Sequence, residues 1–110
     1  MAQIRTATIA SGSNVSTAVE IQGRNIDYEI GSLILEGTYT NTSFDVQVEI
    51  DGTWFDIYDP NGSKYNVAVA NGKHSLQADT FKDVNKVRVK GASNEGAQRT
   101  IKFLLVDLLK

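Results

Sequence analysis

Apolar and polar side chains alternate along the central segment of the chain, residues 44–50. The apolar members, which fall on one side of an extended strand, are Phe44, Val46, Val48 and Ile50. This period of two is typical of a strand with one buried face. Asp51-Gly52 supplies the positive-φ positions of a tight turn, so the run 54–58 is predicted to return as the second strand of a hairpin. On that return strand, the alternation predicts that Phe55 and Ile57 point into the core. The opposite face then carries Trp54, Asp56 and Tyr58.

Similar patterns recur along the rest of the chain. The other segments that we predict as strands are 4–9, 15–21, 25–30, 33–39, 65–69 and 84–90. Gly31 is expected to interrupt the two segments on either side of it, and turns rich in Gly, Asn and Ser separate most of the others. Residues 76–81 fit either a short extended piece or a single helical turn.

The last segment, 100–109, is apolar on both faces. One face carries Ile101, Phe103 and Leu105, and the other carries Leu104, Val106 and Leu108. A strand of this kind is either central in its sheet or lies against another surface. About eight short strands with hardly any helical periodicity indicate an all-β fold, a single antiparallel β-sandwich or jelly roll. We expect one domain over residues 1–110, with residues 1–6 as an N-terminal arm.

Composition narrows the class of protein. A chain of 110 residues without cysteine has neither disulfides nor thiolate metal sites, which suits a reducing cytoplasm. The net charge is −2 and the basic residues are scattered, so we expect no nucleic-acid partner. No apolar run approaches the roughly 20 residues of a membrane span, and the N-terminus lacks the apolar core of a signal peptide. We therefore expect no membrane association.

Candidate chemistry is sparse. The single histidine, His74, has no G-x-S-x-G nucleophile elbow to serve, and we interpret it as a surface residue at the start of a strand. An oxygen-rich segment contains Asp51, Asp56, Asp59 and Asn61. Calcium loops use such residues, but the terminal bidentate acid of an EF-hand is missing, so the pattern favours an ordinary turn. The sequence thus predicts no enzyme, no metal and no cofactor.

The aromatic residues of the hairpin admit two interpretations. Trp54 and Tyr58 are suited to stacking against a sugar ring or contacting a protein partner. Aromatic residues at alternate positions in a small sandwich also commonly fill its core. A glycan site would show a concave, exposed aromatic residue with convergent polar groups, whereas a protein-docking surface would be flat and apolar.

Several strand and turn motifs resemble a family of small structural proteins of tailed bacteriophages. The similar segments are Thr8-Ile9-Ala10-Ser11-Gly12-Ser13-Asn14 and its continuation to Ile21, Phe44-Asp45-Val46-Gln47-Val48, Asp51-Gly52-Thr53-Trp54-Phe55-Asp56-Ile57-Tyr58-Asp59, Val87-Arg88-Val89-Lys90-Gly91 and Ala97-Gln98-Arg99-Thr100-Ile101. They cover most of the chain in the family's order. The chain departs from the family pattern before Phe44, where residues 37–43 are polar in place of a Pro and a Trp near an apolar strand.

The resemblance implies a virion protein assembled in the host cytoplasm. The expected role is a capsid decoration or cement subunit, a homo-oligomer that binds the major capsid protein or other virion proteins through many weak contacts. The expected contact residues lie on the chain ends and the hairpin: Ile4, Trp54, Tyr58, Phe103, Leu105 and Leu108. The alternative is a neck, tail or fibre component whose sandwich binds a receptor or glycan, because such folds host both roles. An enzyme that degrades the cell envelope ranks third, since Asp56 and Asp59 are merely turn neighbours.

Overall fold

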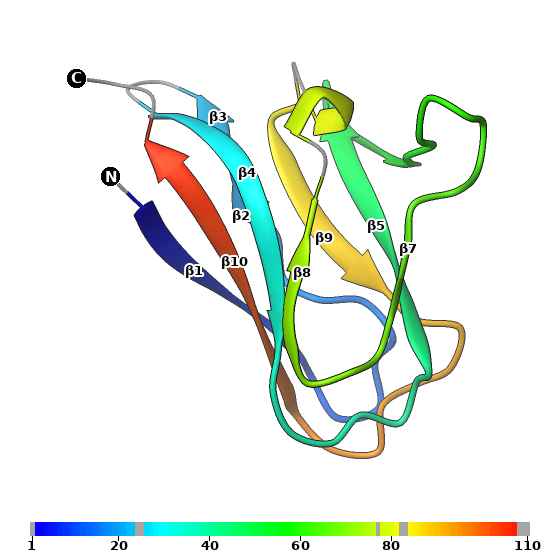
Figure 1. The fold of residues 1–110 in the computed structure, drawn as a ribbon. Coiled ribbons are helices and arrows are strands. Elements are labelled where there is room, and N and C mark those ends of the chain that lie inside the picture. Colours follow the sequence, from blue (N-terminus) through cyan, green and yellow to red (C-terminus); the bar gives the residue numbers. More distant parts are fainter. Residues whose placement is uncertain (1, 24–25, 77, 82–83, 108–110) are drawn as a thin grey trace.

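Two antiparallel sheets pack face to face in the computed structural model, which describes residues 2–23, 26–76, 78–81 and 84–107 (Figure 1). The elements are β1 (Ala2–Ile9), β2 (Val19–Glu20), β3 (Gln22–Gly23), β4 (Ile26–Leu35), β5 (Ser43–Ile50), β6 (Thr53–Asp56), β7 (Asn66–Ala68), β8 (Gly72–Ser75), the 3₁₀ turn η1 (Ala78–Phe81), β9 (Lys86–Lys90) and β10 (Arg99–Asp107). The fold is a β-sandwich, as predicted. Within the described ranges, no helix is long and apolar enough to cross a membrane.

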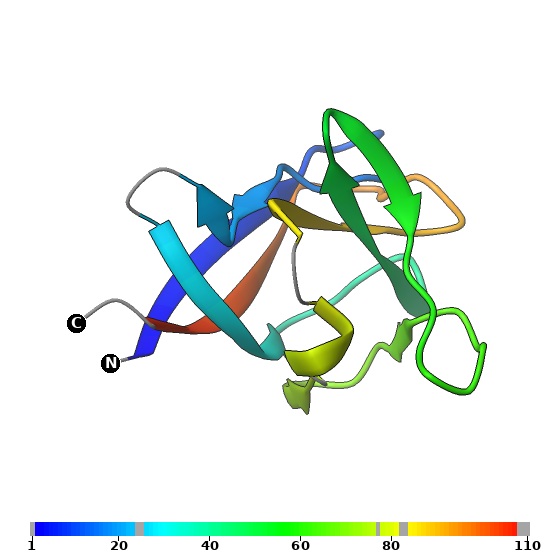
Figure 2. The same ribbon diagram turned by 90° about the horizontal axis from the view of Figure 1, so that it is seen from above.

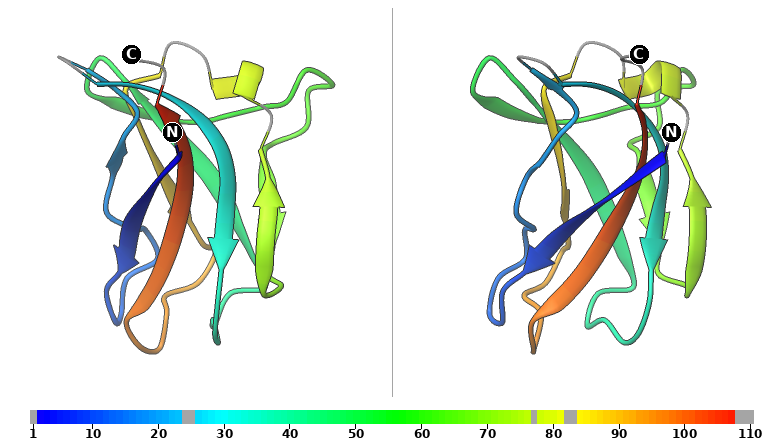
Figure 3. Two further views of the ribbon diagram at one scale, coloured as in Figure 1. Left: turned by 60° about the vertical axis from the view of Figure 1, so that its left-hand side comes forward. Right: turned by 90° about the vertical axis from the view of Figure 1, so that its left-hand side faces the viewer.

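In each sheet, shorter strands pair with longer central strands, which are β4 and β10 in one sheet and β5 in the other. In the first, which we call the terminal sheet, β10 lies between β1 and β4, and β4 also pairs with β3 and β8 (Figure 3). In the second, the hairpin sheet, β5 lies between β9 and the hairpin partner β6, while β2 pairs with β9 and β7 with β5 (Figure 2). The first and last strands of the chain are therefore neighbours, with Ala2 opposite Val106.

The core lies between the two sheets and is made by alternate residues of their strands. On β10, Ile101, Phe103 and Leu105 are fully buried, which places this central strand's inner face at the middle of the core. Phe44 and Val46 of β5 face them from the hairpin sheet and are equally buried. Burial of this apolar surface is the main contribution to the stability of the fold.

Gly31 does not end a strand, contrary to the sequence-based expectation. β4 runs through it as one strand, and the register against β10 shifts there, from Leu104 opposite Ser32 to Leu105 opposite Ile30. A Cβ atom at Gly31 would lie 3.2 Å from the Leu104 carbonyl oxygen. The glycine therefore permits a β-bulge with a close backbone approach, which bends the strand without breaking it.

The central hairpin forms as predicted. Asp51 and Gly52 have φ angles of 53° and 84°, so both turn positions are left-handed, as a two-residue hairpin of this kind requires. Other boundaries differ from the sequence pattern. Within 15–21, ladder pairing as a strand is limited to Val19–Glu20, and 33–39 stops pairing at Leu35. Residues 78–81 adopt the helical alternative as one 3₁₀ turn.

The N-terminal arm expected for residues 1–6 is not separate from the sheet, as far as the structure describes it. Residues 2–6 belong to β1 and pair in continuous register with β10, from Ala2 opposite Val106 to Thr6 opposite Lys102. The backbone ladder continues to the end although the side-chain pattern reverses, since Ala7 and Ile9 are buried in the core whereas Ile4 lies exposed on the outer face. What the sequence suggested as an arm is an edge strand.

Candidate interaction surfaces

Two of the residues predicted to contact partners are in the core. Phe103 and Leu105 have no exposed surface, because they occupy the inward positions of β10. The prediction that they form an interface is therefore wrong, and the alternation of the strand is the reason. Leu108 lies outside the described residues. The apolar residues at outward positions of the same strand are Leu104 and Val106.

An apolar cluster lies on the outer face of the terminal sheet. It consists of Ile4, Leu104 and Val106, which we call the outer patch. Ile4 is 55% exposed and Val106 is 38% exposed, while Leu104, directly opposite Ile4, is half-buried. Charged side chains border the patch: Glu29 is opposite Val106 on β4, and Lys102 forms an ion pair of 3.5 Å with Glu36. An apolar centre with a charged border is typical of a protein-docking surface.

Trp54 is not an open platform for stacking. It lies half-buried on the outer face of the hairpin sheet, and the guanidinium carbon of Arg88 is 4.2 Å from the centroid of its ring. The same guanidinium donates from Nε to Gln47 Oε1 at 2.8 Å. Arg88 therefore occupies one face of the indole through a cation–π contact. Burial lowers the pKa of Arg88 below its usual value, but the group remains a cation.

A chain of polar contacts continues from Gln47 across this face. Gln47 Nε2 donates to Asp56 Oδ1 at 2.9 Å, and Lys64 lies 3.6 Å from Asp56 and 3.8 Å from Asp45. The hydrogen bond from Gln47, together with the charge of Lys64, holds the pKa of Asp56 below its usual value despite the opposing effect of desolvation. A carboxyl group held ionised in this way is suited to fixing neighbouring strands, not to donating a proton.

The other predicted aromatic positions differ in exposure. Tyr58 is 54% exposed, consistent with the outer position expected for it. Phe55 was expected in the core but is 49% exposed. It does lie opposite Val48 and hence on the core side of the hairpin sheet, but β6 is an edge strand, where the core covers less of a side chain than at the centre of the sheet. Ile57 is half-buried and packs against the core.

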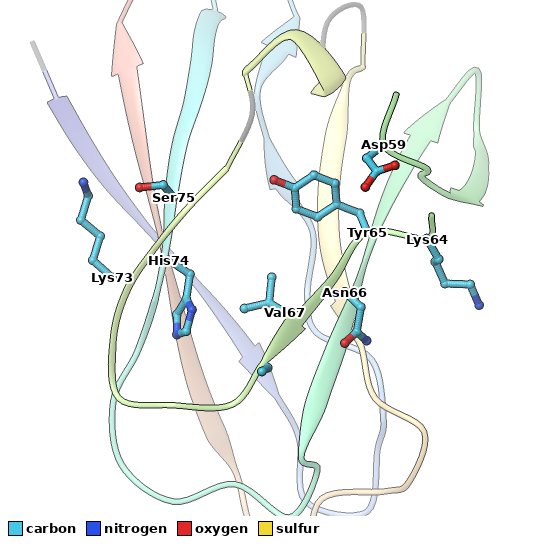
Figure 4. A pocket seen from close by; sticks show the side chains of 9 residues that line it. Asp59, Lys64, Tyr65, Asn66, Val67, Lys73, His74 and Ser75 are labelled. Carbon is cyan, nitrogen blue, oxygen red and sulfur yellow. The ribbon is translucent and has the colours of Figure 1, made fainter. Parts of the chain in front are cut away.

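A recess of about 530 Å³ lies between β7 and β8, where the two sheets are joined by the turn 69–71. Its lining residues are Asp59, Lys64, Tyr65, Asn66, Val67, Ala68, Lys73, His74 and Ser75. Figure 4 shows His74 and Val67 directed toward each other across the recess, whereas Lys64 and Lys73 extend away from it. The strand alternation explains this division, because inward positions line the recess and outward positions form its rim.

His74 has a structural role, because it holds the turn between the two sheets. It lies on β8 opposite Leu33, is half-buried, and its Nε2 is 2.8 Å from the carbonyl oxygen of Ala70. With a proton on Nε2, the ring donates this hydrogen bond and closes the turn that joins the two sheets. The residue is thus more buried than a surface residue at the start of a strand.

The oxygen-rich segment after the hairpin is organised as a turn. Asp59 Oδ1 accepts hydrogen bonds from the backbone N–H groups of Asn61 at 2.9 Å and Ser63 at 3.0 Å. This is the ordinary function of an aspartate in a tight turn. In the described part of the chain, no group of three or more His, Cys, Asp or Glu side chains is arranged to hold a metal ion.

Sequence reasoning missed Glu95, the most buried charged residue described. Its carboxylate accepts hydrogen bonds from the backbone N–H groups of Thr40 at 2.7 Å and Asn41 at 3.0 Å, from Asn41 Nδ2, and from Arg99 Nε at 2.9 Å. Burial by itself would raise the pKa of Glu95, but these hydrogen bonds outweigh it and lower the pKa to about 2. Glu95 therefore clamps the loop 36–42 to the loop 91–98 at one end of the sandwich.

No protein-family model matches the chain, and no curated protein matches it with significant similarity.

Proposed function

We propose that the protein is a non-enzymatic structural subunit of a tailed-phage virion, a decoration or cement protein that docks on the capsid shell through the outer patch. One observation carries this proposal: three adjacent apolar side chains, Ile4, Leu104 and Val106, lie exposed or half-exposed on the outer face of a sheet. The resemblance to phage structural proteins supplies the identity of the larger assembly.

The chemistry of the patch supports docking to a protein. Side chains on the solvent face of a sheet are normally polar, and here the terminal sheet has polar and charged residues around a small apolar centre. Such a contact is weak for one copy. Many copies on a symmetric shell would stabilise one another, because each further contact forms at a high effective concentration.

Cryo-electron microscopy of virions of the encoding phage tests the location. Density for this sandwich at regular positions over the shell, with the outer face of the terminal sheet toward the capsid protein, is the expected result. Density confined to the neck, tail or fibres would overturn the decoration role.

A matched pair of variants tests the surface. Val106→Lys places a charge in the outer patch, whereas Ile50→Lys places one on a similarly exposed apolar position of the hairpin sheet, 41% against 38% exposed. Purified variants are added to shells that lack the protein, and co-sedimentation is measured. We expect Val106→Lys to lose most of its binding and Ile50→Lys to retain it. Equal binding by the two variants would exclude the outer patch as the docking surface.

The recess between β7 and β8 favours a second function, glycan binding by a neck, tail or fibre component. It is concave, contains an aromatic residue in Tyr65, and has polar groups on its rim, including Asn66 and Ser75. Concavity and polar groups at the rim are two features of a saccharide site, while the Tyr65 ring itself is half-buried and packs edge-on against Phe81. Titration with saccharides of the host cell envelope, followed by NMR, tests this function. Shifts confined to residues 64–75 would support it, and their absence would exclude it for the saccharides used.

A further inference from the structure

The free edge of β1 differs from the other edges of the sandwich. β1 is eight residues long, whereas the other edge strands that the structure describes have two to four residues. Its side chains at positions 4 and 6 are uncharged and β-branched. Natural proteins usually protect long edges with charges, proline or bulges, because unpaired backbone groups recruit another strand.

Hydrogen bonds at Thr8 establish which backbone groups of β1 are free. The N–H group of Thr8 donates to Thr17 Oγ1 at 3.0 Å, and its carbonyl oxygen accepts from the N–H group of Thr17 at 2.9 Å. Thr8 therefore faces away from β10. Because backbone groups of successive residues alternate in an antiparallel ladder, Ile4 and Thr6 also direct their N–H and C=O groups away from β10. These groups are available to a partner strand, while those of Thr8 are already used.

We infer that a second copy of this chain pairs with β1 antiparallel, in a two-fold symmetric register that places Ile4 opposite Ile4 of the partner subunit. The inference deepens the proposed function, on which it rests for the biological use of the dimer. It names another copy of the chain as the partner of the β1 edge, which borders the outer patch.

The register follows from the groups that are free and from charge. Centring the two-fold axis on Ile4 pairs positions 2, 4 and 6 with positions 6, 4 and 2, the longest pairing that leaves the bonds of Thr8 intact. Centring it on Arg5 would bring two guanidinium groups face to face, which is unfavourable. In the chosen register, Arg5 lies opposite the partner's Gln3. That pairing is chemically suitable, because Arg5 Nη1 already donates to Gln3 Oε1 of its own chain at 3.1 Å.

The dimer would also extend the apolar surface. Leu104 lies opposite Ile4 in the same sheet, so the two-fold axis generates one row across both copies: Leu104, Ile4 and their two symmetry mates. Two separate outer patches become one continuous patch without burying either. An isologous interface closes on itself, so the pairing ends at two copies and does not continue into a fibre.

Single cysteine variants test the register, since the natural chain has no cysteine and any disulfide must be intermolecular. In the proposed pairing, the Cα atoms at position 4 are about 5.5 Å apart, within disulfide reach. Those at position 6 are separated by about 14 Å, because position 6 lies four residues from its symmetry mate along the partner strand and one strand spacing across from it. Under mild oxidation we expect Ile4→Cys to form covalent dimers much faster than Thr6→Cys or Arg5→Cys. Faster cross-linking at position 5 or 6, or equal rates at all three positions, would overturn the register.

Two proline substitutions test whether the free edge of β1 forms the dimer. Thr6→Pro removes an N–H group that faces the open edge, so it should convert the dimer to a monomer in light scattering without breaking the ladder to β10. Ala68→Pro is the matched control, because Val69 N–H bonds to Thr42 and Ala68 therefore faces the free edge of β7. We expect Ala68→Pro to stay dimeric. A wild-type protein that is monomeric at high concentration would overturn the proposed dimer but not the proposed docking surface. The docking surface is tested separately, by the binding of the variants to shells.

Discussion

The guanidinium group of Arg88 lies over the indole ring of Trp54, with its central carbon 4.2 Å from the ring centroid. The two side chains come from β9 and β6, which flank β5 on either side, so the contact bridges three strands on the outer face of the hairpin sheet. Gln47 of β5 completes the bridge by accepting from Arg88 and donating to Asp56. The bridge explains why an aromatic residue on a solvent face is half-buried.

Removing the guanidinium should destabilise the hairpin sheet. We expect Arg88→Ala to lower the free energy of unfolding by about 1–2 kcal/mol, because it removes the cation–π contact and leaves Gln47 Oε1 without this donor. Trp54 is the one tryptophan of the chain, so its fluorescence reports directly on the site, and its emission should shift to longer wavelength. Urea unfolding measures the loss. Lys90→Ala, two positions along the same face, is the control and should change the stability by less than about 0.5 kcal/mol.

Glu95 should make stability depend on pH at the acid end. Its pKa is lowered from 4.5 to about 2 in the folded protein, so the ionised carboxylate contributes stability above the unfolded pKa. That contribution, roughly 3 kcal/mol for a shift of this size, is lost as the pH falls from about 4.5 through about 2. Urea unfolding of Glu95→Gln should show a stability deficit relative to wild type that is largest at pH 7 and shrinks toward pH 2. A deficit that does not vary with pH would show that the carboxylate charge is unimportant to the clamp.

Gly91 should tolerate no side chain. A Cβ atom there would lie 2.4 Å from Cγ of Asn41, whose amide bonds to Ser93 and Glu95. We expect Gly91→Ala to cost about 2–4 kcal/mol in thermal or urea unfolding, because Asn41 must move and lose these bonds. Gly12→Ala isolates backbone strain alone, since Gly12 has a φ of 82° with open space around it, and should cost about 1 kcal/mol. Similar losses for the two variants would contradict the steric explanation.

The two faces of β10 should respond differently to truncation. Phe103→Ala removes a fully buried ring and should cost about 3–5 kcal/mol. Leu104→Ala, one position along, removes a half-buried side chain from the outer face and should cost about 1 kcal/mol. Urea unfolding at equal protein concentration compares them. A larger loss for Leu104→Ala would show that the faces are assigned the wrong way round.

Local patterns predicted much of the fold. The alternation of residues 44–50 and the Asp51-Gly52 turn were sufficient for the hairpin, because both depend on neighbours in sequence. The boundaries of short edge strands were poorly predicted, since pairing at Val19–Glu20 depends on whether β9 lies alongside. Gly31 was misinterpreted for a related reason: a glycine can end a strand or form a bulge, and the partner strand decides between them.

The candidate surfaces were less predictable. On a strand with two apolar faces, sequence alone does not tell which face is inward, and the surface positions were expected to include Phe103 and Leu105, which are buried. Nor does sequence tell that Arg88 would cover Trp54, because the two residues are distant along the chain. No local sequence pattern indicated the clamp at Glu95, since its partners at positions 40 and 41 are more than fifty residues away along the chain.

The position of β10 in the middle of the terminal sheet has a consequence for synthesis. β1 and β4 are made early, yet neither can complete its ladder until β10 has left the ribosome, because β10 lies between them. The ladder between β1 and β10 joins residues about a hundred positions apart, the kind of non-local pairing that slows folding. The nascent chain therefore holds β1 without its partner until β10 has emerged, and the order in which the strands emerge delays closure of this sheet.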